Sequence, residues 1–95
     1  MLIGVSKEVK SHEYRVGLTP GSVREIVHHG HEVVVEAGAG TGIGFEDASY
    51  EAVGARILPS KTAVFAAAEL IVKVKEPQPK EAASLREGQV LFTYL

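Results

Sequence analysis

Short apolar runs alternate along this chain with amphipathic segments, and that alternation is the strongest constraint on its fold. The clearest run is Val33-Val34-Val35, within a predicted strand over residues 31–36. Three consecutive β-branched residues place apolar side chains on both faces of a strand, which is typical of parallel sheets covered by helices on each side. Strand and helix patterns that alternate in this way indicate the α/β class.

The same patterns predict five strands with four helical segments between them. Strands are expected at residues 2–5, 31–36, 56–58, 70–74 and 90–94, and helices between Thr19 and Gly30 and at residues 46–53, 60–68 and 80–86. We expect a doubly wound parallel sheet, a three-layer sandwich that is flavodoxin-like in general layout, with the strand order left open. Because the last strand runs to Leu95, we expect the domain to be incomplete at its C-terminus.

Length, charge and composition exclude several functions. Ninety-five residues suit one domain, residues 1–95. A net charge of −2 makes nucleic acid a poor partner, and the absence of cysteine excludes disulfides and thiolate sites. The longest uncharged stretch, residues 37–45, is far shorter than the roughly 20 residues of a membrane span. With no signal-peptide pattern at the start, we expect a cytoplasmic protein without membrane contact.

Ligands of open parallel sheets bind beyond the carboxyl ends of the strands, which selects the loop over residues 6–18 and the end of the fourth strand. Arg15 in that loop either clamps a carboxylate with two hydrogen bonds or pairs with a nearby glutamate. Lys75 is placed to meet an anion at the carboxyl edge; alternatively, Lys75 and Lys73 both extend to solvent. Together, Arg15 and Lys75 would form a double-cation site for a small carboxylate.

A glycine-rich segment and a histidine cluster suggest a dinucleotide site and a metal site, but neither motif has the required pattern. Residues 38–44 are rich in glycine and follow a strand, but G-x-G-x-x-G fails because the sixth position is Ile43 or Phe45. We expect a mobile loop that packs near a ligand or partner, with a flavin-phosphate loop as the alternative. Residues 28–31 read HHGH, but partly cationic histidines suit a helix C-terminus, and we predict no metal site.

The motifs taken in order resemble the N-terminal signature of the alanine dehydrogenase and proton-translocating transhydrogenase family. The matching segments are residues 4–8, 13–20, 35–40, 43–45, 72–77 and 88–95, so the resemblance covers essentially the whole chain. Tyr14, Gly17 and residues 75–77 resemble the alanine dehydrogenase branch more. Two departures lie in the first loop: Ser6 stands where the family commonly has proline, and His12 where it commonly has asparagine.

The resemblance implies an NAD-dependent enzyme that interconverts L-alanine with pyruvate and ammonia. Such enzymes have two doubly wound domains, and this chain would be the N-terminal fragment of the substrate domain. The dinucleotide-binding domain, which holds NAD, would be absent, and the chain alone would be inactive. When full length, the protein would be a homo-oligomer, either a hexamer or a dimer.

The resemblance also assigns site residues. Arg15 matches the family arginine that holds the pyruvate carboxylate, and Lys75 the lysine that contacts the carboxylate and the carbonyl oxygen. Tyr94 is a further candidate for lining the cleft. The proton-transferring histidine of the family is expected just past Leu95, so we expect no catalytic residue within this chain.

Two other functions remain open at this point. The chain would also suit the N-terminal part of a proton-translocating NAD(P) transhydrogenase alpha subunit, a hydride-transfer partner of a membrane pump. A third possibility is a non-catalytic module that binds a carboxylate or a protein, with the apolar final strand as an assembly edge.

Overall fold

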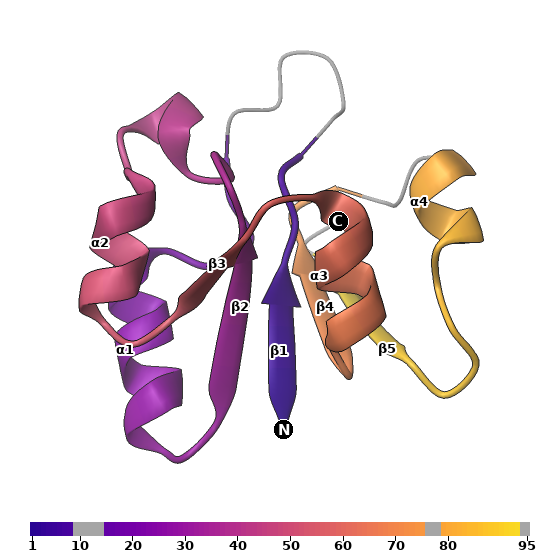
Figure 1. The fold of residues 1–95 in the computed structure, drawn as a ribbon, viewed down its shortest axis with the longest axis horizontal. Helices are drawn as coiled ribbons and strands as arrows, with labels where there is room; N and C mark the ends of the chain where they lie inside the picture. Colours follow the sequence, from indigo (N-terminus) through magenta and orange to yellow (C-terminus); the bar gives the residue numbers. More distant parts are fainter. Residues whose placement is uncertain (9–14, 76–78, 94–95) are drawn as a thin grey trace.

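The computed structural model describes residues 1–8, 15–75 and 79–93, which form a parallel sheet flanked by helices (Figure 1). Along the chain the elements are β1 (Leu2–Val5), α1 (Pro20–His28), β2 (Glu32–Glu36), the 3₁₀ turn η1 (Thr41–Ile43), α2 (Asp47–Ala52), β3 (Arg56–Leu58), α3 (Lys61–Ala67), β4 (Leu70–Lys73), α4 (Pro79–Ala83) and β5 (Val90–Thr93). The five predicted strands and four helices are therefore confirmed. The ends of several elements differ by one residue from the prediction, and α4 ends at Ala83 instead of residue 86.

The strands are ordered β3-β2-β1-β4-β5, and every neighbouring pair is parallel. From the central strand β1 the chain runs outward through β2 to β3, and then crosses to β4 and β5 on the other side. The predicted doubly wound class is confirmed, with the strand order of a Rossmann fold rather than the order 2-1-3-4-5 of flavodoxin. The order reverses between β1 and β4, and a crevice beyond their carboxyl ends is the general ligand position in such sheets.

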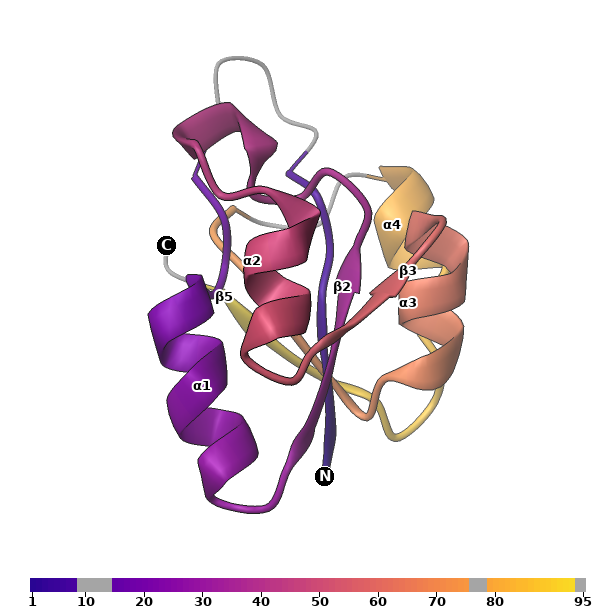
Figure 2. The same cartoon turned by 60° about the vertical axis from the view of Figure 1, so that its left-hand side comes forward.

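Helices α1 and α2 lie on one side of the sheet and α3 on the other, which makes three layers (Figures 1 and 2). Each face of the sheet has its own apolar core. The core beneath α1 and α2 includes Ile3, Val5, Val23, Val33, Val35, Tyr50 and Val72. The core on the α3 side is made of Val34, Val64, Phe65, Ala68 and Ile71. Alternate residues of the inner strands β2, β1 and β4 thus pack into opposite cores, which explains why their buried residues are apolar on both faces.

The helix ends are set by the residues that the sequence offers there. Thr19 caps α1 by accepting a hydrogen bond from the Ser22 amide at 3.3 Å, and Pro20 takes the first helical position. Gly30 follows α1 with a φ of 91°, the left-handed conformation that ends a helix at glycine. In the same way, Ser60 caps α3 by accepting from the Ala63 amide at 3.2 Å.

One edge of the sheet is apolar and exposed. β5 pairs with β4, and its Val90 and Phe92 are 55% and 52% exposed. Edge strands with exposed apolar side chains are surfaces on which another strand or chain can pair. Within the described ranges, no helix is long and apolar enough to cross a membrane.

The contact between β1 and α3 requires a glycine at position 4. A Cβ built there would lie 2.7 Å from Ala68 Cβ and 2.9 Å from Val64 Cγ1. We predict that Gly4→Ala lowers the free energy of unfolding by about 1–3 kcal/mol because the core on the α3 side has no room. The measurement is urea unfolding of the wild type and the variant.

Gly21→Ala in α1 is the matched control. A Cβ at Gly21 would meet only Thr19 Oγ1, at an ordinary 3.9 Å, and alanine favours a helix by about 1 kcal/mol over glycine. We expect this control to be neutral or stabilising. Equal destabilisation by both substitutions would contradict the packing argument.

Candidate functional site

The loop that leads from β1 into α1 is fixed at its second half by two contacts. Gly17 packs against the end of β4 so closely that a Cβ there would lie 2.5 Å from the Val72 carbonyl oxygen. From the other side, the buried Tyr50 hydroxyl donates a hydrogen bond of 2.7 Å to the Leu18 carbonyl oxygen. Arg15 is therefore attached to a segment whose position is set by β4 and α2.

Arg15 opens onto a pocket of about 330 Å³ at the carboxyl edge of the sheet. The pocket is lined by Arg15, Val16, Gly17, Thr19, Ser22, Ile43 and Val74. Its walls combine one guanidinium, two hydroxyl-bearing residues and aliphatic side chains. A guanidinium can bind a carboxylate through two parallel hydrogen bonds, and aliphatic walls suit a small apolar substituent.

The glycine-rich segment over residues 38–44 forms one wall of this pocket through Ile43. It is a compact turn: Gly40 packs against Phe45 and Tyr50, and the Gly40 carbonyl oxygen accepts from the amides of Ile43 and Phe45 at 3.2 and 2.9 Å. Gly38 donates to Asp47 Oδ1 at 2.9 Å. Because these amides already donate to Gly40 or to Asp47, they are not free to hold the pyrophosphate of a dinucleotide, whose site needs free backbone N–H groups.

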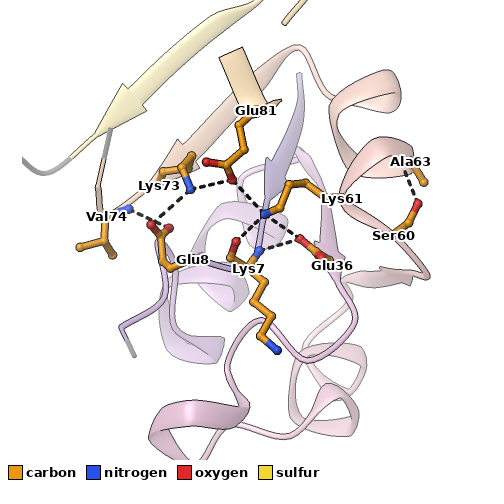
Figure 3. A network of polar contacts seen from close by, with 9 residues as sticks. All are labelled: Lys7, Glu8, Glu36, Ser60, Lys61, Ala63, Lys73, Val74 and Glu81. Carbon is orange, nitrogen blue, oxygen red and sulfur yellow. Dashed lines mark hydrogen bonds and ion pairs between the residues drawn. The ribbon is translucent and has the colours of Figure 1, made fainter. Parts of the chain in front are cut away.

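A chain of alternating charges lies at the same edge on the α3 side (Figure 3). This ion-pair chain consists of Glu8, Lys73, Glu81, Lys61 and Glu36. Lys73 Nζ lies 3.2 Å from both Glu8 Oε1 and Glu81 Oε2. Lys61 Nζ lies 2.9 Å from Glu81 Oε2 and 3.2 Å from Glu36 Oε1.

The inner members of this chain are removed from water. The side chain of Lys73 is 1% exposed, and those of Glu8 and Glu81 are 2% exposed. Charges at such positions are tolerated because each has an opposite charge beside it, and removing one partner from a buried pair costs about 3–5 kcal/mol. The alternative in which Lys73 extends to solvent is therefore wrong.

Glu8 has a second set of contacts, with the backbone that follows β4. Its Oε2 accepts a hydrogen bond of 3.0 Å from the Val74 amide, and its Oε1 accepts one of 3.2 Å from the Lys75 amide. Glu8 thus holds the β4 exit, which we define as residues 74 and 75. The sequence pattern placed Glu8 in the loop and gave no sign of this role, since its partners are more than 60 residues away in the chain.

The predicted site residues are placed as follows. Arg15 lines the pocket, and Val74 brings the β4 exit to the same pocket. Lys75 is the next residue and is partly buried, but it is not among the residues that line the pocket. Tyr94 and residues 9–14 and 76–78, including His12 and Tyr14, lie outside the described residues. Within the described ranges, no three metal-ligating side chains gather.

Ser6 is a buried polar residue for which the described part of the chain shows no hydrogen bond from the side chain. Its side chain is fully buried just past β1, and within the described part of the chain its Oγ has no hydrogen-bond partner. A buried hydroxyl without a partner costs about 1–3 kcal/mol in lost hydration. We predict that Ser6→Ala leaves the free energy of unfolding unchanged or raises it, as thermal and urea unfolding would show. A clear loss of stability would reveal a hydrogen bond to Ser6.

Tyr50 makes the Arg15 loop sensitive to high pH. Burial, and to a lesser extent the Asp47 carboxylate, raises the pKa of Tyr50 from 10.0 to about 12. Because the folded value exceeds the unfolded one, the stability that Tyr50 contributes is complete below pH 10 and is lost as the pH rises towards 12. We predict that Tyr50→Phe costs about 1 kcal/mol at pH 7, through the lost hydrogen bond to Leu18, and less at pH 11.

Urea unfolding of the wild type and Tyr50→Phe at the two pH values checks this expectation. The comparison isolates Tyr50, because the other groups that titrate at alkaline pH are common to both proteins. If the difference in the free energy of unfolding between the two proteins stays constant from pH 7 to pH 11, folding does not raise the pKa of Tyr50.

The sequence matches known proteins over its whole length. The family model described as alanine dehydrogenase/PNT, N-terminal domain, matches residues 4–95. The alanine dehydrogenases of Halomonas elongata and Bacillus subtilis are 57% and 53% identical to this chain over all 95 residues. The chain covers 26% and 25% of these proteins, and so spans about a quarter of the length of these curated relatives.

Solved structures agree with this match. An L-alanine dehydrogenase superposes with a TM-score of 0.95 at 49% identity, covering 100% of this chain and 26% of the other. The transhydrogenase from Sinorhizobium meliloti superposes with a TM-score of 0.91 at 35% identity, covering 100% of this chain and 28% of the other. The chain therefore belongs to the alanine dehydrogenase/PNT N-terminal domain family.

Proposed function

We propose that this chain is the N-terminal part of the substrate domain of an NAD-dependent L-alanine dehydrogenase, and that it binds the carboxylate of L-alanine and pyruvate. The observation that carries the proposal is the pocket where Arg15 meets the β4 exit at the carboxyl edge of the sheet. The pocket combines a cation with aliphatic walls, which suits a short acid with a methyl group. The relatives that are 57% and 53% identical are named alanine dehydrogenases, which supports the same assignment.

In the complete protein, the Arg15 guanidinium would hold the substrate carboxylate by two parallel hydrogen bonds. The Lys75 ammonium would lie near the carboxylate and the carbonyl oxygen of pyruvate, where its positive charge draws electrons from the carbonyl carbon and favours attack by ammonia. Both groups bind and orient. Neither is proposed to carry the proton, which would be transferred by a histidine beyond this chain.

NAD would supply hydride transfer, and the residues described here do not fit its binding. The glycine-rich turn uses its own amides internally, and within the described residues no other glycine-rich loop enters a helix. We therefore assign NAD to a further domain of the complete protein and expect the 95 residues alone to be inactive. The transhydrogenase function is the second candidate, because the Sinorhizobium meliloti protein shares the fold at 35% identity.

The test is steady-state reduction of pyruvate and ammonium by NADH with the full-length protein. We predict that Arg15→Met raises the KM for pyruvate by roughly 10- to 100-fold, because a charge-assisted hydrogen bond contributes about 1.5–3 kcal/mol. Lys75→Met should also raise this KM and lower kcat, since the charge acts on the reacting carbonyl. The KM for NADH should be unchanged in both variants.

Arg24→Met is the matched control, because Arg24 is an exposed arginine of α1 that lines a different depression. It should leave both KM values at wild type. A wild-type KM for pyruvate in Arg15→Met would overturn the carboxylate assignment. Hydride exchange between two nicotinamide nucleotides, without reduction of pyruvate, would instead favour the transhydrogenase function. A protein that binds pyruvate and catalyses neither reaction would point to a binding module.

A further inference from the structure

The backbone bends directly after β4, at Val74 and Lys75. Among the described residues, the last pair of the ladder between β4 and β5 is Lys73 with Thr93, and the chain bends at residues 74 and 75. Past that point, the Val74 and Lys75 amides donate to the carboxylate of Glu8. The position of the Lys75 backbone is therefore set by a side chain from the other side of the switch point, at the end of β1.

The Glu8 carboxylate is itself held in one place. Its Oε1 accepts from Lys73 Nζ at 3.2 Å, and the side chains of both residues are almost completely buried. Lys73 is held in turn by Glu81 of α4 at 3.2 Å (Figure 3). A carboxylate that accepts from one ammonium and two amides in a dry environment has little freedom to move, because each displacement leaves a buried donor without a partner.

The loop between β1 and α1 contacts β4 and the β4 exit through residues near each of its ends. Glu8 lies near its start and contacts the amides of residues 74 and 75 on the side of Lys73. Gly17 lies near its end and packs on the Val72 carbonyl, on the side of the core beneath α1 and α2. Arg15 is two residues before Gly17 in the chain and lines the same pocket as Val74 of the β4 exit.

We propose that Glu8 is a positioning residue for Lys75: by holding the Val74 and Lys75 amides with its carboxylate, it sets the Lys75 ammonium at the proper place relative to Arg15. The inference rests on the proposed function, in that it takes Lys75 to contact the substrate. In this role, Glu8 does not contact the substrate and does not transfer a proton in the reaction. Misplacing a binding group by about 1 Å can cost up to about 100-fold in rate, so a carboxylate that fixes the backbone has a measurable effect.

The experiment compares Glu8→Gln with Lys75→Met in the full-length protein, with pyruvate as the variable substrate. Glutamine keeps the volume but can no longer offer two acceptor oxygens to the three donors. We expect the KM for pyruvate to rise roughly 10- to 100-fold. The KM for NADH should stay at wild type. In the Lys75→Met background, Glu8→Gln should add no further increase, because a residue that acts only through Lys75 has no effect once that ammonium is gone.

Glu36→Gln is the matched control within the same ion-pair chain. Glu36 accepts from the Lys7 amide at 2.8 Å and pairs with Lys61, so its described contacts lie away from the β4 exit. We expect it to lower stability and leave the KM for pyruvate unchanged. An equal rise of this KM in Glu36→Gln and Glu8→Gln would overturn the inference, because both effects would then come from general loosening of the edge.

Glu8→Gln leaves Lys73 with one carboxylate fewer, and a failure to fold would hide the effect on binding. The double variant Glu8→Gln/Lys73→Met removes that buried cation and should recover stability in urea unfolding. Its KM for pyruvate should stay raised, because the two amides still lack their carboxylate. Recovery of the KM together with stability would contradict the inference.

The results also separate this inference from the proposed function. A wild-type KM for pyruvate in Lys75→Met would overturn the substrate contact of Lys75, and the positioning role with it. A raised KM in Lys75→Met with a wild-type KM in Glu8→Gln would overturn the positioning role alone. Additive effects of the two substitutions would likewise show that Glu8 acts by a route other than Lys75.

Discussion

The buried ammonium of Lys73 determines how the carboxyl edge of the sheet is arranged. An ammonium that is 1% exposed requires carboxylates beside it, and Glu8 and Glu81 supply them from the end of β1 and from α4. Glu81 also pairs with Lys61 at the start of α3, which links the edge to β2 through Glu36. One charge in the interior therefore connects three strand ends and two helices, and each of these elements has to be in place before the charge is satisfied.

At the carboxyl edge, one face of the sheet carries the ion-pair chain and the other face carries the pocket. On the α3 side, the ion-pair chain fixes backbone and side chains in a dry environment. On the other face, the pocket with Arg15 is open to solvent and is built from short contacts of glycine and tyrosine, with Gly17 on Val72 and Tyr50 on Leu18. Rigid support beneath an accessible cation is the arrangement that pre-organised binding requires.

The sequence was sufficient to predict the layers of this fold, because its signals there are local. The run Val33-Val34-Val35 and the caps at Thr19 and Ser60 each act within a few residues, and the structure contains the strand and helices they predict. The strand order could not be predicted in this way, since pairing of β1 with β4 depends on contacts between distant segments.

In the candidate site, too, local signals could be read from the sequence and contacts between distant residues could not. Arg15 was predicted because a loop after a first parallel strand lies at the ligand edge, and the family resemblance named the same residue; in the structure it lines a pocket. Lys73 was misjudged because its partners are not neighbours in sequence: Glu8 is 65 residues away, and an isolated lysine in a strand reads as solvent-exposed. Glu8 was missed for the same reason. The substrate-binding roles of Arg15, Lys75 and Tyr94 remain predictions.

The position of β1 at the centre of the sheet has a consequence for the order in which the molecule forms during translation. β1 is made before β2 and can pair with it early, but its other neighbour, β4, follows only after β3 and α3. Until then one edge of the central strand is open and Glu8 stays hydrated, because its ammonium partner has not yet been synthesised. The ion pair of Glu8 with Lys73 therefore forms late, because the long chain segment between β1 and β4 has to be closed into a loop first. A nascent chain that is halted before β4 carries an unpaired strand edge on β1.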